Sequence, residues 1–423
     1  MRRKRDPKSV TKRNEPVPST AGGDFAAGDD FVDQRPVWAW IDQDALRHNA
    51  RRAIEAADGR TVIGVVKADG YGHGATTVAR VLLAEGVARL AVVSIGEGAT
   101  LRRDGIAAPI LLLGGLADAA SAARAMKWGL TPVLQEVREV EFAQGFGRPD
   151  APLAVEVELD TGMRRMGVGP DQAASLLTRV LEASQLSLSG VFTHLARADE
   201  SDPAASRVQC AEAASLLAKV FEPNDHRPTL HIANSAGLLR RAEFEDGICE
   251  TGAVRPGLML YGVSPFADRA AAGESASAED VDLEPAMTLA ARVIALRRVA
   301  AGDSVGYGGE WTAPSATTIA TLPIGYADGI PRAVLGRGRV ELAGAMRPIV
   351  GRVSMDSVCV DVGDAAISVG DVATVFGRTP LGQRIPVENF AHEAGTIGYE
   401  ILVGVGARVP RIVGNGNPPS GVA

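Results

Sequence analysis

Short apolar runs rich in Val, Ile and Leu recur eight times in the chain, and stretches with the apolar spacing of a helix separate most of them. Continuous apolar strands that alternate with helices indicate a parallel sheet covered by helices on its outer side. Eight such units in roughly 230 residues favour a closed (β/α)₈ TIM barrel of the α/β class. An open doubly wound sheet is less favoured, because no Gly-x-Gly-x-x-Gly follows the first run. The runs cover residues 62–66, 90–94, 110–113, 132–134, 153–159, 186–192, 229–232 and 258–261.

The helical spacing gives way, after about residue 277, to alternating β-branched stretches punctuated by Gly. Such a sequence predicts a mostly-β domain with tight turns. Residues 38–41 form a further predicted strand that could pair with either domain, before a helix that starts near Asp44. We therefore expect a barrel at 36–277, a β domain at 278–415 and a flexible C-terminus at 416–423. The β stretches cover residues 289–296, 317–322, 339–342, 349–353, 358–362 and 372–376.

The N-terminal segment, residues 1–35, differs from the rest in composition. Its first 15 residues hold seven Lys/Arg against two Asp/Glu, and Pro, Gly and Asp follow with almost no apolar residues. Such a segment cannot bury enough surface to offset the entropy of ordering it. The basic start is not followed by the apolar stretch of a secretory signal. We expect a disordered basic tail rather than an address or an interaction arm.

Charge and residue content exclude several classes of protein. The net charge of −7 argues against a general nucleic-acid binder, and no run approaches the roughly 18 apolar residues of a membrane helix. The three cysteines (Cys210, Cys249 and Cys359) are odd in number and widely spaced, which fits free thiols in a reducing, cytoplasmic compartment. The six histidines show no metal-ligand spacing, so no metal site is expected.

Polar residues cluster where the apolar runs end, which in a barrel is where chemistry takes place. Lys67 follows the first run, and partial burial there would lower its pKa and make it a candidate nucleophile or base. A lysine whose amine reaches out to solvent is the alternative. Ser235 and Gly257 lie where late barrel loops commonly hold phosphate. The other segments at run ends are residues 160–165, 193–194 and 233–237, and residues 255–257 come just before the eighth run.

Nine motifs in the chain resemble those of the PLP-dependent alanine racemases, which are fold-type III PLP enzymes. The strongest is Val-Val-Lys-Ala-Asp-Gly-Tyr-Gly-His-Gly at 65–74, which resembles the cofactor-lysine motif of that family. The motifs occur in the family's order and span roughly residues 36–413. The others lie at 159–167, 193–196, 233–235, 254–262, 305–308, 323–329, 355–356 and 395–400.

The resemblance implies two catalytic bases. Lys67 would form the internal aldimine with pyridoxal 5′-phosphate (PLP) and then act as one base on the external aldimine. Tyr307 would be the other base and would reach the site from the β domain of a partner subunit, which implies a homodimer with shared active sites. Racemisation removes a proton from one face of a carbon and returns one to the other face, so two bases suit it.

The resemblance also assigns the residues around the cofactor and the amino-acid substrate. Arg255 would face the pyridine nitrogen, where its positive charge disfavours protonation and so limits reactions other than proton exchange. Arg165 would lie near the cofactor phenolic oxygen and the substrate carboxylate. The remaining cofactor residues would be Tyr71, His194, Asn234, Ser235, Gly257 and Leu258, and the remaining substrate residues Met355, Asp356 and Tyr326, the last narrowing the access channel.

Two positions depart from the family pattern. Many members have a lysine, which can be carbamylated, where this chain has Glu158. A carboxylate there could supply the carbamate's charge directly and orient Arg165 through a bidentate pair. Ala407 stands where some members have a tyrosine near the second base, so the pocket could be wider and admit serine or larger amino acids.

Four functions are compatible with the resemblance. We expect an alanine racemase that supplies D-alanine for peptidoglycan. The alternatives are a racemase of broader specificity, acting on serine or basic amino acids, and a PLP-binding protein without turnover. A decarboxylase with the same two domains is disfavoured by the motifs that contain Arg255 and Tyr307.

Overall fold

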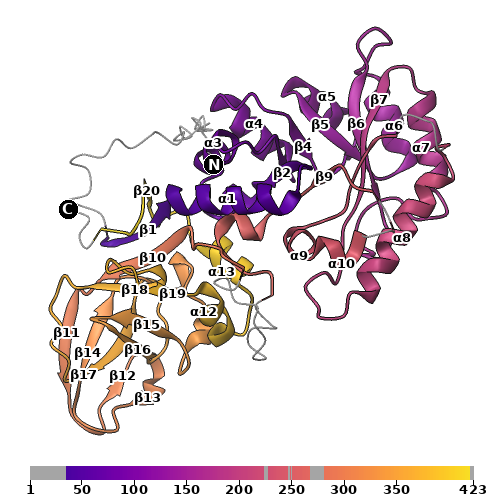
Figure 1. The fold of residues 1–423 in the computed structure, drawn as a ribbon. Helices are drawn as coiled ribbons and strands as arrows, with labels where there is room; N and C mark the ends of the chain where they lie inside the picture. The colour runs from indigo at the N-terminus through magenta and orange to yellow at the C-terminus, as the bar shows by residue number, and fades with distance from the viewer. Residues whose placement is uncertain (1–34, 223–226, 246–247, 249, 267–280, 420–423) are drawn as a thin grey trace, which may run out of the picture. The chain divides into compact units, whose positions relative to one another are not determined.

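The computed structural model describes residues 35–222, 227–245, 248, 250–266 and 281–419. The predicted basic tail, apart from Arg35, and the last four residues of the predicted flexible C-terminus lie outside the described residues. Eight parallel strands close into a barrel in chain order, so the predicted TIM barrel is confirmed (Figure 1). The barrel strands are β2 Thr61–Val65, β3 Arg89–Val92, β4 Ile110–Leu112, β5 Leu130–Leu134, β6 Leu153–Leu159, β7 Leu186–Thr193, β8 Thr229–His231 and β9 Ala253–Val254.

Helices follow the strands and pack around the outside of the barrel, as Figure 1 shows. The first of them, α1, begins where the Asp42 carboxylate accepts hydrogen bonds from the backbone N–H groups of Asp44 and Ala45. Its buried residues recur with helical spacing, which places one apolar face on the barrel. The helices are α1 Gln43–Ala57, α3 Ala75–Ala84, α4 Ile95–Arg103, α5 Ala119–Lys127, α6 Val137–Gln144, α7 Ala173–Glu182, α8 Ala204–Ala218, α9 Ser235–Leu239 and α10 Arg241–Glu245.

The eighth strand was predicted in the wrong place. The run at 258–261 is buried but forms a 3₁₀-helix, η2 Leu258–Tyr261, and the strand is the short β9 before it. Proline has no backbone N–H to donate to a neighbouring strand. Pro256 therefore favours a strand that ends just before it, as β9 does, over one that continues through it. Arg255 therefore follows the last strand, at the same end of the barrel as the other polar segments.

The mostly-β domain is a sheet in the order β11-β14-β17-β16-β15-β18-β10-β1-β20, with β19 paired to β18. The predicted strand at 38–41 belongs to this sheet, because β1 pairs antiparallel with β10 and parallel with β20. The stretch at 289–296 is divided between two strands. The strands are β1 Val37–Asp42, β10 Met287–Arg292, β11 Ala295–Val299, β14 Thr317–Leu322, β15 Arg339–Leu342, β16 Ala345–Val350, β17 Val358–Gly363, β18 Val372–Arg378, β19 Arg384–Ile385 and β20 Arg411–Gly414.

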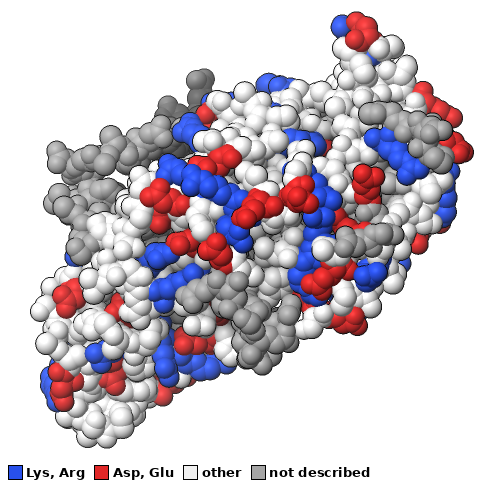
Figure 2. All heavy atoms as spheres, in the orientation of Figure 1, with Lys and Arg blue, Asp and Glu red and all other residues white. Residues whose placement is uncertain are grey.

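Two helices and a small hairpin complete the β domain. The helices are α12 Val387–Ala394 and α13 Gly398–Gly404, and the hairpin joins β12 Ser304–Val305 to β13 Trp311–Thr312 through the 3₁₀ turn η3 Tyr307–Gly309. Among the described residues, no helix is both long and apolar enough to cross a membrane. Figure 2 shows Lys/Arg and Asp/Glu side chains next to one another across the face it presents, without a broad area of one sign.

Candidate active site

The C-terminal end of the barrel opens into a cavity of about 1080 Å³. Its walls come from the segments after seven barrel strands (all but β5) and from residues around α13 of the β domain. Nine of the predicted site residues line it: Lys67, Tyr71, Arg165, His194, Asn234, Ser235, Arg255, Gly257 and Leu258. Polar segments that are up to 191 residues apart in sequence therefore meet at one place. Their chemical roles remain predictions.

Lys67 starts a turn, α2 Lys67–Tyr71, whose backbone is left-handed. Ala68, Asp69 and Tyr71 have φ of 51°, 53° and 52°, and Gly70 has φ of 60°. Residues other than Gly cost roughly 1–2 kcal/mol each in this conformation, and such strain is concentrated at functional sites. The sequence pattern did not predict this turn, because only one of these four residues is glycine.

Specific hydrogen bonds hold the strained turn in place. The backbone N–H of Ala68 donates to Glu97 Oε1 at 2.7 Å, and the N–H of Ala75 donates to Asp69 Oδ1 at 2.8 Å. From the β domain, Arg411 Nε donates to the carbonyl of Gly72 at 3.0 Å. Both domains therefore fix the backbone that carries Lys67.

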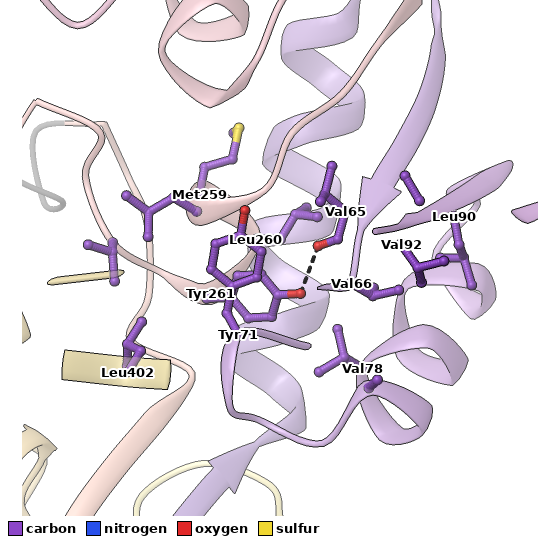
Figure 3. Close-up of a cluster of buried hydrophobic side chains, with 14 of the residues drawn as sticks. Val65, Val66, Tyr71, Val78, Leu90, Val92, Met259, Leu260, Tyr261 and Leu402 are labelled. Atoms are coloured by element: carbon purple, nitrogen blue, oxygen red, sulfur yellow. Dashed lines mark hydrogen bonds between the residues drawn. The ribbon is translucent and has the colours of Figure 1, made fainter. Parts of the chain in front are cut away.

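Tyr71, the last residue of this turn, is buried against a second tyrosine. Its ring stacks on that of Tyr261, with centroids 4.6 Å apart, and the Tyr261 hydroxyl donates to the Val65 carbonyl at 2.9 Å (Figure 3). In the figure Leu402, from α13, lies on the opposite side of the tyrosine pair from Val78. The Tyr71 hydroxyl approaches Gly257 so closely that a Cβ on this glycine would lie 2.5 Å from the oxygen.

We expect Gly257→Ala to lower the free energy of unfolding by about 1–3 kcal/mol, because the new methyl group overpacks the buried Tyr71. It should also weaken PLP binding, since Tyr71 would have to move within the cavity wall. Urea unfolding and a PLP titration measure the two effects. Gly404→Ala is the matched control, because nothing lies within 4 Å of the added Cβ and its backbone is helical. Equal effects in both variants would contradict the argument.

Burial changes the pKa of two basic side chains at the cavity. Burial lowers the pKa of Lys67, and the nearby charge of Arg165 lowers it further. Burial lowers the pKa of His194 to about 3, helped by Arg255, Arg165 and Lys67, so its ring is neutral near pH 7. Among the described residues, neither the Lys67 amine, the Arg165 guanidinium nor the His194 ring has a hydrogen-bond or ion-pair partner. These groups remain available to a ligand.

The Arg255 guanidinium forms hydrogen bonds within the protein through Nη1 and Nη2. Its Nη1 donates to His231 Nδ1 at 2.6 Å and to the His231 carbonyl at 2.8 Å, and its Nη2 donates to the Thr193 carbonyl at 2.7 Å. The guanidinium lies 4.4 Å from the ring centroid of Phe192. The Nε–H has no hydrogen-bond partner within the described part of the chain, which leaves it for an acceptor in the cavity.

Glu158 lines the same cavity, but the expected bidentate pair with Arg165 does not form among the described residues. Instead Gln135 Nε2 donates to Glu158 Oε2 at 2.6 Å. Burial raises the pKa of Glu158, and the Gln135 hydrogen bond and the charges of Arg255 and Arg165 act against that rise. Gln135 takes the hydrogen bond that had been expected for Arg165.

Four predicted site residues do not line this cavity: Tyr307, Tyr326, Met355 and Asp356. Tyr307 lies in the β12–β13 hairpin and is 71% exposed. Tyr326 and Met355 are also exposed. Arg408 holds the last two positions together, because it donates to Asp356 at 2.6 Å and to the Met355 carbonyl at 3.4 Å.

The sequence argument missed Tyr399 as a site residue. It lines the cavity from α13, and its ring centroid is 6.1 Å from that of Tyr71. Its motif at 395–400 was recognised, but without a role, and this was the only signal that could have indicated it. Thr396, Ile397, Glu400 and Val403 line the same rim. Ala407 is exposed and does not line the cavity of its own chain.

The cavity suits PLP on four structural grounds. Lys67 supplies an unpaired amine for the aldehyde carbon, and the free Nε–H of Arg255 can meet a ring nitrogen. Ser235 Oγ accepts from the backbone N–H of Gly257 at 2.9 Å, which places the hydroxyl against the loop that would hold phosphate. Three basic side chains, Lys67, Arg165 and Arg255, line the cavity against two carboxylates, Glu158 and Glu400, an excess that suits an anionic cofactor.

Comparisons with known proteins show which family the chain resembles. Residues 41–265 match the family described as alanine racemase, N-terminal domain, and residues 286–413 match alanine racemase, C-terminal domain. An alanine racemase of Desulforamulus reducens is 38% identical over 390 residues, which are 90% of this chain and 99% of that protein. The crystal structure of the biosynthetic alanine racemase from Pseudomonas aeruginosa superimposes with a TM-score of 0.80 at 35% identity, covering 90% of this chain and 100% of that one. For the alanine racemase from Streptomyces coelicolor the TM-score is 0.81 at 32% identity, with 90% and 98% covered. The chain therefore belongs to the alanine racemase family of fold-type III PLP enzymes.

Proposed function

We propose that this protein is a PLP-dependent isomerase that interconverts L-alanine and D-alanine. The observation that carries the proposal is the convergence of Lys67, Arg165, His194 and Arg255 on one cavity at the C-terminal end of the barrel, with donors left unpaired. When bound, PLP withdraws electrons from the α-carbon of the amino acid and so makes its proton acidic. The family and its curated relatives support the same activity.

Different residues of this chain bind different parts of the cofactor. Tyr71, Asn234, Ser235, Gly257 and Leu258 hold the phosphate end of the cofactor, in the part of the cavity where Tyr71 meets Gly257. The Arg255 Nε–H would serve as a donor for the ring nitrogen, and the neutral His194 ring would be a ring-side residue that adds no charge.

Two side chains act on the substrate itself. The Arg165 guanidinium binds the carboxylate of the amino acid and so orients the α-carbon. Burial lowers the pKa of the Lys67 amine, which favours its neutral form, and this form takes the α-proton from one face.

A second subunit would complete the site. Tyr307 would take or give the proton on the other face, Tyr326 would narrow the access channel, and the Met355–Asp356 segment would contact the substrate. In this proposal they belong to a partner subunit in a homodimer, since all four lie outside the cavity of their own chain. The volume of about 1080 Å³ exceeds what PLP and alanine need and leaves space for partner side chains.

One alternative keeps specific support and another is disfavoured. The alanine at 407 favours a broader racemase that also accepts serine or basic amino acids. A PLP-binding protein without turnover would keep Lys67 but would have no use for Tyr307. In the proposed role the protein works in the cytoplasm and supplies D-alanine for peptidoglycan.

Chiral chromatography of a reaction with PLP and L-alanine tests the proposal. We expect D-alanine to accumulate until the two enantiomers are equal, because free L- and D-alanine have the same energy in water. The starting enantiomer should not change this end point. No D-alanine, but turnover of serine, lysine or arginine, would support the broader racemase. No turnover of any amino acid would overturn the racemase assignment.

A further inference from the structure

A chain of four polar groups, three of them buried, leads from the cavity into the interior of the barrel. Its members are Arg255, His231, Glu156 and Arg89, from the segment after β9 and from β8, β6 and β3. The side chains of His231 and Glu156 have no exposed surface. Barrel interiors are normally filled by branched apolar residues, and a buried ion pair often stabilises no more than apolar residues of the same volume. Stability alone therefore does not account for this network.

The distances form a continuous relay. Arg255 Nη1 lies 2.6 Å from His231 Nδ1, and His231 Nε2 lies 2.9 Å from Glu156 Oε2. Arg89 Nη2 lies 2.6 Å from the other carboxylate oxygen, Glu156 Oε1. The imidazole also stacks on Phe192, with centroids 4.9 Å apart, which fixes the plane of its ring.

The donors and acceptors fix the proton on His231. An arginine can only donate, so Nδ1 must accept from Arg255, and an ionised carboxylate can only accept, so Nε2 must carry the proton. Burial lowers the pKa of His231 to about 4, although Glu156 acts against this, so the ring is neutral near pH 7. Burial alone would raise the pKa of Glu156, but the hydrogen bond from His231 and the charges of His231 and Arg89 outweigh it and lower this pKa to about 2.

The neighbouring backbone leaves space for the carboxylate. The register of β6 with β7 shifts between Val155 and Glu156. Gly190, on β7, faces Glu156 so closely that an added Cβ would lie 2.8 Å from its Cδ. A side chain at 190 would displace Glu156 from His231.

We propose that Glu156 is a positioning residue for Arg255, acting through the fixed tautomer of His231. Glu156 keeps the proton of His231 on Nε2, which leaves His231 Nδ1 free to accept from Arg255 Nη1. This hydrogen bond fixes the guanidinium so that its Nε–H faces the cavity. The inference rests on the proposed function, in which this edge meets the ring nitrogen of PLP. A carboxylate behind the imidazole also makes Nδ1 a stronger acceptor, which tunes the hydrogen bond that Arg255 offers to the ring.

Glu156→Gln is the variant that tests the relay. Arg89 can only donate, so the new amide must turn its oxygen toward Arg89 and its NH₂ toward His231 Nε2. His231 then has to carry its proton on Nδ1, where it opposes the N–H of Arg255. The double variant Glu156→Gln with Arg89→Met removes the donor that turns the amide and should restore the original tautomer.

Nitrogen-15 NMR of histidine-labelled protein, with His231→Asn to identify the signal, reports the tautomer without PLP. The absorption band of bound PLP, kcat and KM are then measured with L-alanine. We expect the proton to move to Nδ1 in the single variant, the band to shift, and kcat to fall about tenfold with little change in KM. Glu245→Gln is the matched control, because Glu245 is also buried and paired with Thr251 and Arg241 but does not contact Arg255.

The results separate this inference from the proposed function. An unchanged tautomer in Glu156→Gln overturns the relay, as does a changed tautomer with the wild-type band and kcat. Effects that Glu245→Gln reproduces also overturn it. If Glu156→Gln does not fold, the double variant with Arg89→Met decides. The Nε2–H tautomer together with a kcat near that of the wild type supports the relay. A double variant that has neither property overturns it. A wild-type protein that neither binds PLP nor forms D-alanine instead overturns the proposed function, whatever the tautomer.

Discussion

Lys67→Ala should lower the rate of racemisation by at least about 10³-fold, because one side chain is asked both to hold the cofactor covalently and to move a proton. The chain offers few substitutes for it. Only two other lysines lie within the described residues, Lys127 and Lys219, and both are exposed and absent from the cavity lining. Burial at the candidate site lowers the pKa of Lys67.

Attachment of the cofactor can be measured separately from turnover. Borohydride reduction of the PLP-loaded protein, followed by peptide mass spectrometry, should find the added pyridoxyl group on Lys67. Lys127→Ala and Lys219→Ala are the matched controls and should keep both the label and the activity. Label on another lysine, or D-alanine formation by Lys67→Ala at the wild-type rate, would refute the assignment.

The general fold and most of the cavity could be predicted because both depend on local patterns. Apolar runs alternating with helical stretches specify a covered parallel sheet, and the polar segments that follow the strands must meet at one end of it. The same reasoning misplaced the eighth strand. The run at 258–261 is apolar because it is buried, and burial does not distinguish a strand from a 3₁₀-helix.

What could not be predicted depends on contacts between distant residues. Nothing local in Ala68 or Asp69 favours a left-handed backbone, which is held by Glu97 and by Arg411 from the other domain. The relay behind Arg255 joins residues 75 apart in sequence at Glu156 and His231, and pattern analysis had assigned neither a role. Gln135 is a similar case, because its contact with Glu158 crosses from one strand end to the next.

Heterodimers with one Lys67→Ala subunit and one Tyr307→Phe subunit should have about half of the wild-type activity, although each variant alone is nearly inactive. In the proposed dimer, each site takes Lys67 from one subunit and Tyr307 from the other. One site of the heterodimer then combines the intact Lys67 with the intact Tyr307, and the other site carries both substitutions. Co-expression with two different affinity tags isolates this species, and the D-alanine assay measures it.

A second heterodimer should be nearly inactive, which excludes the explanation that any mixed dimer keeps half of the activity. It pairs a wild-type subunit with a subunit that carries both Lys67→Ala and Tyr307→Phe. If Tyr307 acts across the interface, each site loses one base and the species is nearly inactive; if Tyr307 serves its own chain, one site stays intact and about half of the activity remains. The exposure of Tyr307 and its absence from the cavity of its own chain favour the first outcome. Half activity in this second species, with none in the first, would disprove the shared site and leave Tyr307 to act on its own subunit.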